Sequence, residues 1–180
     1  MKEIRLEDVR ICQQVMLRVE KLYYNSFPSE ERRAWKDIER LLMVENSPYS
    51  VEVILRGGEF VGFISWWKFV DFCYVEHFAI ETTMRGMGIG ASAISKFIED
   101  RVMPVVLEVE LPGSGEMARR RISFYSRNGF VAHDDFEYIQ PSYGEGLPLV
   151  PLMLMTAGIS ENVDLKHISQ QLHETVYGVK

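Results

Sequence analysis

The sequence predicts a single α/β domain, in which antiparallel hairpins come first and a strand–helix–strand unit follows. Three observations support this fold class: helical spacing opens the chain, alternating runs then meet at a Gly-Gly turn, and a glycine-rich stretch joins a strand to a helix. The chain has 180 residues, 47% of them hydrophobic and 26% charged, which is enough for one domain with its own core.

The first part of the chain has the spacing of amphipathic helices. Ile11, Val15, Val19 and Leu22 recur at intervals close to 3.6 residues, which predicts a first helix. A second helix is predicted to begin at Ser29, because serine is a common N-cap and two glutamates follow where the helix dipole favours them. Its inward face would consist of Trp35, Ile38 and Leu42.

The pattern then changes to period two, which is typical of strands. Residues 50–56 and 59–69 alternate around Gly57-Gly58 and predict a β-hairpin, and residues 71–80 predict a third strand. The later predicted elements are a helix at 91–101, a buried strand at 104–111, a helix at 116–128 closed by Gly129, strands at 130–139 and 150–156, and a helix at 162–178 with the apolar stripe Leu165, Ile168 and Leu172. We expect one domain over residues 1–158, with the C-terminal helix of residues 159–180 packed on it or on a second subunit of a homodimer.

Charge and composition exclude several classes of protein. The formal net charge of −6 argues against a nucleic-acid-binding protein, which needs a basic face. The sequence has no apolar run of 18 residues and no signal peptide at its start, so we expect a cytoplasmic protein without a membrane span. Cys12 and Cys73 lie far apart without a CxxC motif, and we expect reduced, buried thiols and no metal site.

The glycine-rich stretch TTMRGMGIGAS, residues 82–92, is the strongest candidate for a binding site. Glycines occupy every second position after Arg85, and backbone N–H groups at a helix N-terminus can cradle phosphate oxygens. The arginine adds a permanent cation for the same ligand. A turn that binds nothing is the open alternative, whereas a Walker A loop is excluded because Ala91 stands where that motif needs lysine.

A dinucleotide-binding Rossmann motif is a second alternative. Gly86, Gly88 and Ala91 satisfy the spacing G-x-G-x-x-A, and Glu108 follows at about the expected distance. The five residues ETTMR between the strand and the first glycine count against this interpretation. A Rossmann-type NAD(P) oxidoreductase is therefore the less favoured alternative.

Two motifs in the expected order resemble the GNAT superfamily of N-acetyltransferases. Residues 85–90, RGMGIG, resemble the signature Arg/Gln-x-x-Gly-x-Gly/Ala, and the preceding VEHFAI resembles the strand before it. Downstream, ISFYSRNGF resembles the second motif of the family, Phe-Tyr-x-x-x-Gly-Phe. The resemblance covers roughly residues 51–155 and implies a single-domain GNAT fold, with a mixed, mostly antiparallel, twisted sheet flanked by helices.

The resemblance also implies a cosubstrate and a reaction. Acetyl-CoA would donate its acetyl group to a primary amine of a small molecule or peptide, by direct attack in a ternary complex. The strand at Phe78, Ala79 and Ile80 would pair with the pantetheine arm, and the Phe78 amide would polarise the thioester carbonyl. The CoA phosphates would contact Arg85, Gly86, Met87, Gly88, Ile89, Gly90, Ala91 and Arg121. A non-catalytic CoA-binding or regulatory domain of the same fold is the alternative.

Glu76 and Tyr125 are the predicted catalytic residues. Strict alternation along the third strand places Glu76 on one face with Phe78 and Ile80, and His77 on the other face with Cys73 and Ala79. Glu76 would then be a base or an amine anchor, or else a strand glutamate in a salt bridge.

The other candidates are less specific. The resemblance implies that Tyr125 protonates the leaving thiolate, and we expect His77 to be a packed, hydrogen-bonded core residue. Aromatic and acidic side chains suit a cationic amine acceptor, and the candidates are Tyr23, Tyr24, Phe27, Glu30, Glu31, Tyr138, Tyr143 and the loop at 141–148.

Overall fold

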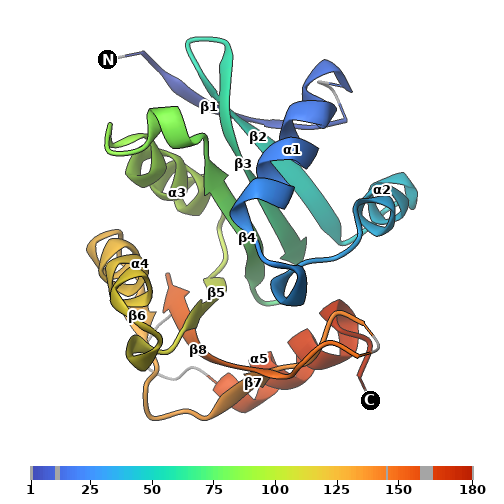
Figure 1. Ribbon diagram of the computed structural model, residues 1–180, viewed down its shortest axis with the longest axis vertical. Coiled ribbons are helices and arrows are strands. Elements are labelled where there is room, and N and C mark those ends of the chain that lie inside the picture. The colour runs from blue at the N-terminus through green and yellow to red at the C-terminus, as the bar shows by residue number, and fades with distance from the viewer. Residues whose placement is uncertain (1, 11–12, 145, 159–163, 180) are drawn as a thin grey trace.

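The computed structural model describes residues 2–10, 13–144, 146–158 and 164–179. Its described strands form one eight-stranded sheet in the order β1-β2-β3-β4-β5-β8-β6, with β7 paired to β8 (Figure 1). The strands are β1 (Ile4–Asp8), β2 (Tyr49–Arg56), β3 (Glu59–Lys68), β4 (Cys73–Ile80), β5 (Val105–Glu110), β6 (Val131–Ala132), β7 (Tyr138–Gln140) and β8 (Val150–Ala157). The helices are α1 (Met16–Ser26), α2 (Trp35–Met43), α3 (Ile89–Glu99), α4 (Glu116–Arg127) and α5 (Leu165–Gln171).

The sheet is mixed and mostly antiparallel, as predicted. Only β4 and β5 pair in parallel, whereas all the other described pairs are antiparallel. A Rossmann domain requires a mostly parallel sheet, so this topology excludes the dinucleotide-binding alternative.

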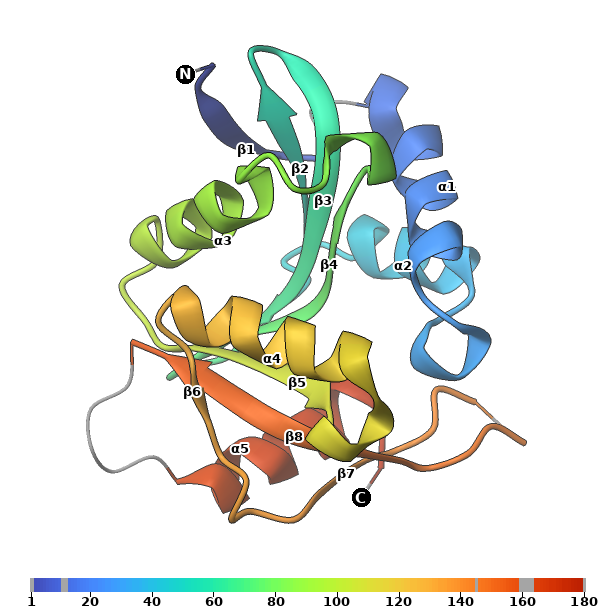
Figure 2. The same cartoon turned by 60° about the vertical axis from the view of Figure 1, so that its left-hand side comes forward.

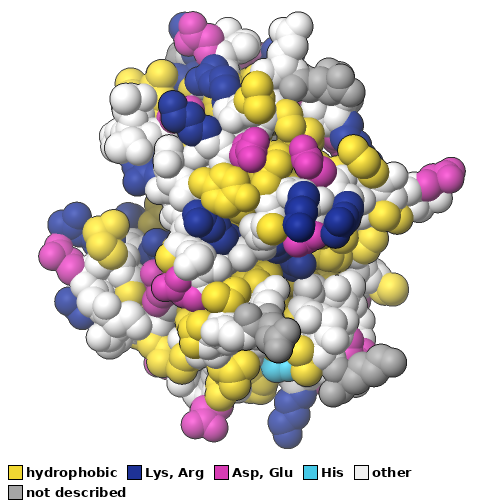
Figure 3. Space-filling view, turned by 45° about the vertical axis from the view of Figure 1, so that its right-hand side comes forward, with side chains coloured by type: hydrophobic (Ala, Val, Ile, Leu, Met, Phe, Trp, Pro, Cys, Tyr) yellow, Lys and Arg dark blue, Asp and Glu magenta, His cyan; other side chains and the backbone are white. Residues whose placement is uncertain are grey.

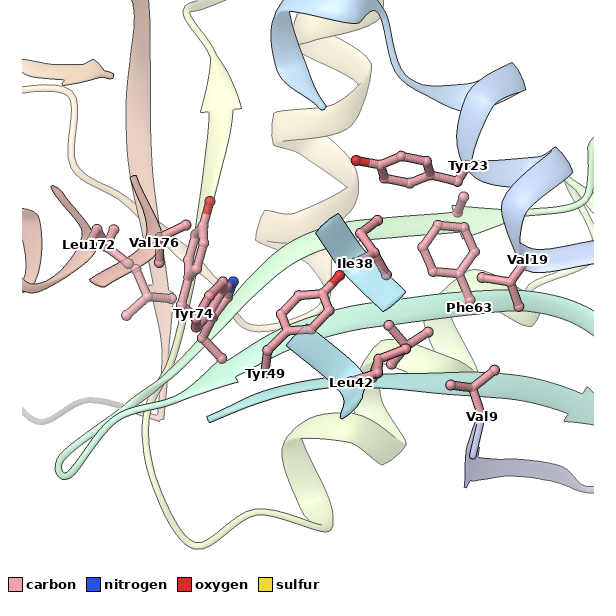
Figure 4. Close-up of a cluster of buried hydrophobic side chains, with 14 of the residues drawn as sticks. Val9, Val19, Tyr23, Ile38, Leu42, Tyr49, Phe63, Tyr74, Leu172 and Val176 are labelled. Carbon is pink, nitrogen blue, oxygen red and sulfur yellow. The ribbon is translucent and has the colours of Figure 1, made fainter. Parts of the chain in front are cut away.

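Helices cover both faces of the sheet and bury a separate core on each (Figure 2). On one face, α1, α2 and α5 pack against side chains that include Phe63 and Tyr74. Figure 4 shows Leu172 and Val176, from the C-terminal helical segment, beside Tyr74 in this core. On the other face, α3 and α4 pack against side chains that include Ile64 and Val75.

The sheet is split between its two central strands. Parallel pairing of β4 with β5 covers only Cys73–Val75 and Val105–Leu107, and the two strands separate beyond those residues. The molecule therefore has two parts, with β1–β4 in one and β5–β8 in the other, which meet at this short pairing (Figure 1). A split of this kind leaves backbone groups of both strands free to face a ligand.

The first strand was not predicted. Residues 4–8 form β1 and pair antiparallel with β2, with Leu6 opposite Ile54. The segment IRLED is short and carries charges at three of its five positions, so the alternation of Ile4 and Leu6 with charged residues is too brief to predict a strand, and the β2 partner decides its structure. The predicted helix that follows is present as α1, although Ile11 and Cys12 lie outside the described residues.

The predicted start of the second helix is wrong. Residues 29–31 form a single 3₁₀ turn, and the helix α2 begins only at Trp35. Ser29 directs its hydroxyl to the carboxylate of Glu30 and caps no helix. The residues between the turn and α2 are extended and bring Arg33 to Glu76. The predicted inward face of α2, Trp35, Ile38 and Leu42, is buried.

Two further boundaries differ from the prediction. The strand predicted at 130–139 is divided into β6 and β7, because a turn at Asp134 and Asp135 interrupts it. The helix predicted at 162–178 begins at Leu165, after the N-cap Asp164, and ends as a π-helical turn over Leu172–Val176. Asn162 and Val163 lie outside the described residues. Its apolar stripe packs in the core shared with α1 and α2.

Candidate functional site

A cleft of about 860 Å³ occupies the split between β4 and β5. Its walls include residues 75–80 of β4, residues 107–110 of β5, the glycine-rich loop before α3, and α4. Some lining side chains belong to the α1 face of the sheet and others to the α4 face, so the cleft passes through the sheet. On the face that Figure 3 shows, acidic and basic side chains alternate among hydrophobic ones.

A β-bulge in β4 determines which side chains face which side of the cleft. Ser65 pairs with His77 and Trp66 pairs with Val75, so Glu76 is an extra residue without a partner on β3. As a result Glu76 and His77 both lie on the α1 face, whereas Phe78 faces α4 and packs near Phe124. The predicted placement of Glu76 on one face with Phe78 and Ile80 is therefore wrong, because strict alternation does not survive a bulge, whereas His77 lies opposite Phe78 as predicted.

Glu76 is buried, and protein groups already engage its carboxylate. Arg33 donates to Oε1 from Nε at 3.0 Å and from Nη2 at 2.7 Å, and the Tyr143 hydroxyl donates to the same oxygen at 2.9 Å. The indole of Trp67 donates to Oε2 at 3.0 Å. Burial alone would raise the pKa of Glu76, but the Arg33 cation and these hydrogen bonds outweigh it and lower that pKa.

His77 is a neutral core residue, as expected. Its Nε2 lies 3.0 Å from the backbone carbonyl of Glu31, and its Nδ1 lies 3.1 Å from the hydroxyl of Ser65. A carbonyl only accepts, so Nε2 carries the proton and Nδ1 accepts from the serine. Burial lowers the pKa of His77, which leaves it uncharged near neutral pH.

Glu108 is the second buried carboxylate of the cleft, and its environment was not predicted. It lies on β5, one residue beyond Leu107, the last residue of β5 that pairs with β4. The hydroxyls of Tyr74 and Tyr177 donate to Oε2 at 2.9 and 2.8 Å, and the Tyr138 hydroxyl donates to Oε1. Among the described residues no cation pairs with it, and burial raises its pKa to about 7.

Arg33 and Tyr177 join distant parts of the chain around these carboxylates. Besides its bonds to Glu76, Arg33 donates from Nη2 to the carbonyl of Val176 at 2.9 Å. The ring of Tyr177 lies 5.1 Å from that of Tyr143, whose hydroxyl binds Glu76. Sequence reasoning missed both residues, and no local motif signals either.

The glycine-rich loop has the backbone conformation that its composition suggests. Gly86 and Gly88 adopt φ of +77° and +75°, a left-handed region that favours glycine, and Gly88 is the N-cap of α3. Of the predicted loop residues, Arg85, Gly86, Gly88, Gly90 and Ala91 line the cleft. The Met87 side chain is exposed toward a smaller hollow near Arg56, and the Ile89 side chain is buried in the core.

The remaining predicted cofactor contacts also line the cleft. Phe78, Ala79 and Ile80 lie where β4 has no strand partner on the β5 side, although Arg85 Nε donates to the Ile80 carbonyl at 3.0 Å. Arg121 of α4 lines the cleft while it pairs with Glu110.

Tyr125 of α4 lines the cleft and is 8% exposed, packed between Phe124 and Phe130. Burial raises its pKa to about 12, so its hydroxyl stays protonated at neutral pH. The described residues contain no group of three or more His, Cys, Asp or Glu placed to hold a metal ion, and no described helix could span a membrane.

Comparisons with known proteins agree with this geometry. The model of the acetyltransferase (GNAT) family matches residues 14–130. A putative GNAT-family acetyltransferase from Bacteroides thetaiotaomicron is 35% identical, with 99% of each chain covered and a TM-score of 0.88. A search of curated proteins found no match.

More distant structures share the fold alone. The ribosomal-protein-S18-alanine N-acetyltransferase from Escherichia coli is 15% identical, with 91% of this chain and 99% of that chain covered and a TM-score of 0.60. Naa50 from Arabidopsis thaliana, solved with a bisubstrate analogue that contains CoA, is 16% identical, with coverages of 87% and 99% and a TM-score of 0.62.

Proposed function

Because the chain belongs to the GNAT family of acetyltransferases, we propose that it transfers the acetyl group of acetyl-CoA to a primary amine, with both substrates bound together. One observation carries this proposal: the cleft passes through the sheet where β4 and β5 separate. A cofactor entering from one face can therefore meet an acceptor entering from the other. Transfer then needs no acyl-enzyme, and buried Cys73 does not line the cleft.

We assign the α4 side of the cleft to acetyl-CoA and call it the cofactor half, made of the lining residues at 78–80, 84–91 and 117–128. Backbone N–H groups at the start of α3 would bind the pyrophosphate, and the residues 78–80 would pair with the pantetheine arm. Arg121 would contact a CoA phosphate once it exchanges its pairing with Glu110.

We assign the α1 side to the amine and call it the acceptor half. Its members are Phe27, Glu31, Glu76, His77, Glu108, Gln140, Tyr143 and Leu152, with Arg33 and Tyr177 behind them. The contacts of Glu76 support a salt-bridged strand glutamate over a base or an amine anchor, because its pKa is lowered and both oxygens are engaged. In this assignment Glu76 holds Arg33 and Tyr143 in place.

The reaction requires one bond to form and one to break. The amine nitrogen attacks the thioester carbonyl carbon, the carbon–sulfur bond breaks, and Tyr125 gives its proton to the departing CoA thiolate. The Phe78 N–H would stabilise the oxyanion between these steps. The raised pKa of Tyr125 keeps the proton available until the thiolate develops.

Calorimetric titration with acetyl-CoA, and with NADH in a parallel cell, tests the proposal. We expect micromolar binding of acetyl-CoA and none of NADH, followed by thiol release when primary amines are added. Absence of acetyl-CoA binding would refute the function. Binding without turnover on any amine would favour the alternative of a non-catalytic CoA-binding domain.

A further inference from the structure

We propose that Glu108 binds the amine of the acceptor and receives its proton, while Gln140 binds an oxygen farther along the same acceptor. The acceptor class that fits both contacts is the amino end of a peptide. This inference rests on the proposed acetyltransferase function, and it assigns a role to residues outside the two sequence motifs.

Glu108 differs from Glu76 in the groups that hold it. Arg33 neutralises Glu76, whereas only tyrosine hydroxyls donate to Glu108 among the described residues. An ammonium ion can therefore add the missing positive charge at Glu108, and none is missing at Glu76. Glu108 also lies at the point where the two strands separate, which is where the two halves of the cleft meet.

The proton then has a defined path. The bound ammonium transfers one proton to the Glu108 carboxylate, and the freed lone pair attacks the thioester carbon. The tetrahedral carbon expels the thiolate, which takes the proton of Tyr125, and the nitrogen loses its second proton to water as the amide forms. Tyr177 is a positioning residue in this scheme, because its hydroxyl holds Oε2 of Glu108 at 2.8 Å.

Gln140 supplies the second contact. Gln140 lines the cleft and is 3% exposed, and its Nε2 has no hydrogen-bond partner among the residues that the structure describes. A buried N–H without a partner costs about 1–3 kcal/mol, so a ligand oxygen that accepts from it gains affinity. This donor selects an acceptor molecule that carries an oxygen as well as an amine.

The two contacts lie on one side of β7 and indicate a ligand that extends along it. Gln140 follows Tyr138 by two residues, so both side chains lie on the same face of the strand, and the Tyr138 hydroxyl binds Glu108. An acceptor that reaches both Glu108 and Gln140 therefore needs its oxygen at a distance from the amine, as a peptide backbone provides. Glu31 also lines the acceptor half, and its charge disfavours a carboxylate there, so a neutral peptide carbonyl fits better.

The pH dependence of kcat/KM with glycylglycinamide tests the role of Glu108. In the unaltered protein kcat/KM should rise through the Glu108 pKa of about 7 and level off near pH 8, where the amine itself loses its proton. Glu108→Gln should lower kcat/KM about tenfold at pH 7, where roughly a tenth of the amine is unprotonated, and kcat/KM should recover as the pH exceeds the pKa of the amine, since the free amine needs no base. Glu99→Gln, on the exposed end of α3, is the matched control.

Tyr177→Phe keeps the test decisive even where Glu108→Gln fails to fold. Loss of one hydrogen bond to the carboxylate should raise the pKa of Glu108 and move the rising limb of the profile to higher pH. An unchanged rising limb in both variants would overturn the assignment. Acetyl-CoA affinity, measured separately, distinguishes this failure from failure of the acetyltransferase function itself.

A pair of acceptors of equal length tests Gln140. Glycylglycinamide and hexylamine each place six chain atoms beyond the amine, but only the peptide offers carbonyl oxygens. Gln140→Met, of similar size, should lower the ratio of kcat/KM for peptide over alkylamine about fivefold to tenfold. The control Ile139→Leu changes the exposed neighbour on β7. An unchanged ratio in Gln140→Met would overturn the peptide class.

Discussion

The two halves of the cleft are built in different ways. The cofactor half uses mainly backbone, from consecutive residues around the start of α3 and along β4. The acceptor half uses side chains from six separate segments, and its Arg33–Val176 hydrogen bond joins residues 143 positions apart. The comparison teaches that a site built from the backbone of consecutive residues has a recognisable local sequence pattern. A site assembled from distant side chains has no such pattern.

If the acceptor half also stabilises the fold, removal of Arg33 should have the largest effect. Arg33→Met leaves the buried carboxylate of Glu76 without its cation and should cost about 3–5 kcal/mol of unfolding free energy. Arg85→Met, in the cofactor half, should change it by less than about 0.5 kcal/mol. Urea unfolding of both variants measures the difference, and equal losses would contradict the distinction between the halves.

The second prediction concerns the pH dependence of stability. The pKa of Glu108 is raised from 4.5 to about 7 by burial, so its favourable contribution is complete below pH 4.5 and is lost as the pH rises through 7. Relative to Glu108→Gln, the unaltered protein should lose about 3 kcal/mol of unfolding free energy between pH 4.5 and pH 8. Urea unfolding at several pH values checks this, and a constant difference would show that the pKa is not raised.

Tyr125 should affect the reaction and not binding. Tyr125→Phe removes the proposed proton donor and should lower kcat about 100-fold, with unchanged acetyl-CoA affinity and little loss of stability. Steady-state kinetics and calorimetry together measure this split. Unchanged kcat would remove Tyr125 as the acid.

The smallest expected effect tests the backbone cradle. Gly88→Asn and Gly88→Asp add side chains of nearly equal size at φ of +75°, where asparagine and aspartate are tolerated better than most residues. A carboxylate beside the pyrophosphate should make the aspartate variant bind acetyl-CoA about tenfold more weakly than the asparagine variant. Equal affinities of the two variants would place the phosphates elsewhere.

Features encoded over a few consecutive residues were predictable from sequence. The hairpin at Gly57-Gly58, the helix after the glycines, and the end of α4 at Gly129 all depend on local backbone preferences. The two motifs also identified the family. The strand β1 was missed because its charged residues are stabilised by pairing with β2 and not by their own pattern.

The acceptor half required information that no single segment contains. Periodicity assigned Glu76 to the wrong face because the bulge depends on the register between β3 and β4. The environment of Glu108 depends on three tyrosines at positions 74, 138 and 177, which come together only in the folded sheet. Ser29 was predicted to cap a helix but lies in a 3₁₀ turn for a similar reason. The chain after the turn must be extended to bring Arg33 to Glu76.

The hydrogen bond from Arg33 to the carbonyl of Val176 joins the N-terminal part of the cleft to residues that are synthesised last. All lining residues of the cofactor half have been synthesised by residue 128, but the surroundings of Glu76 and Glu108 await residues 176 and 177. Chains emerge from the ribosome with the N-terminal part first. The surroundings of the two carboxylates are therefore the last part of the cleft to form during synthesis.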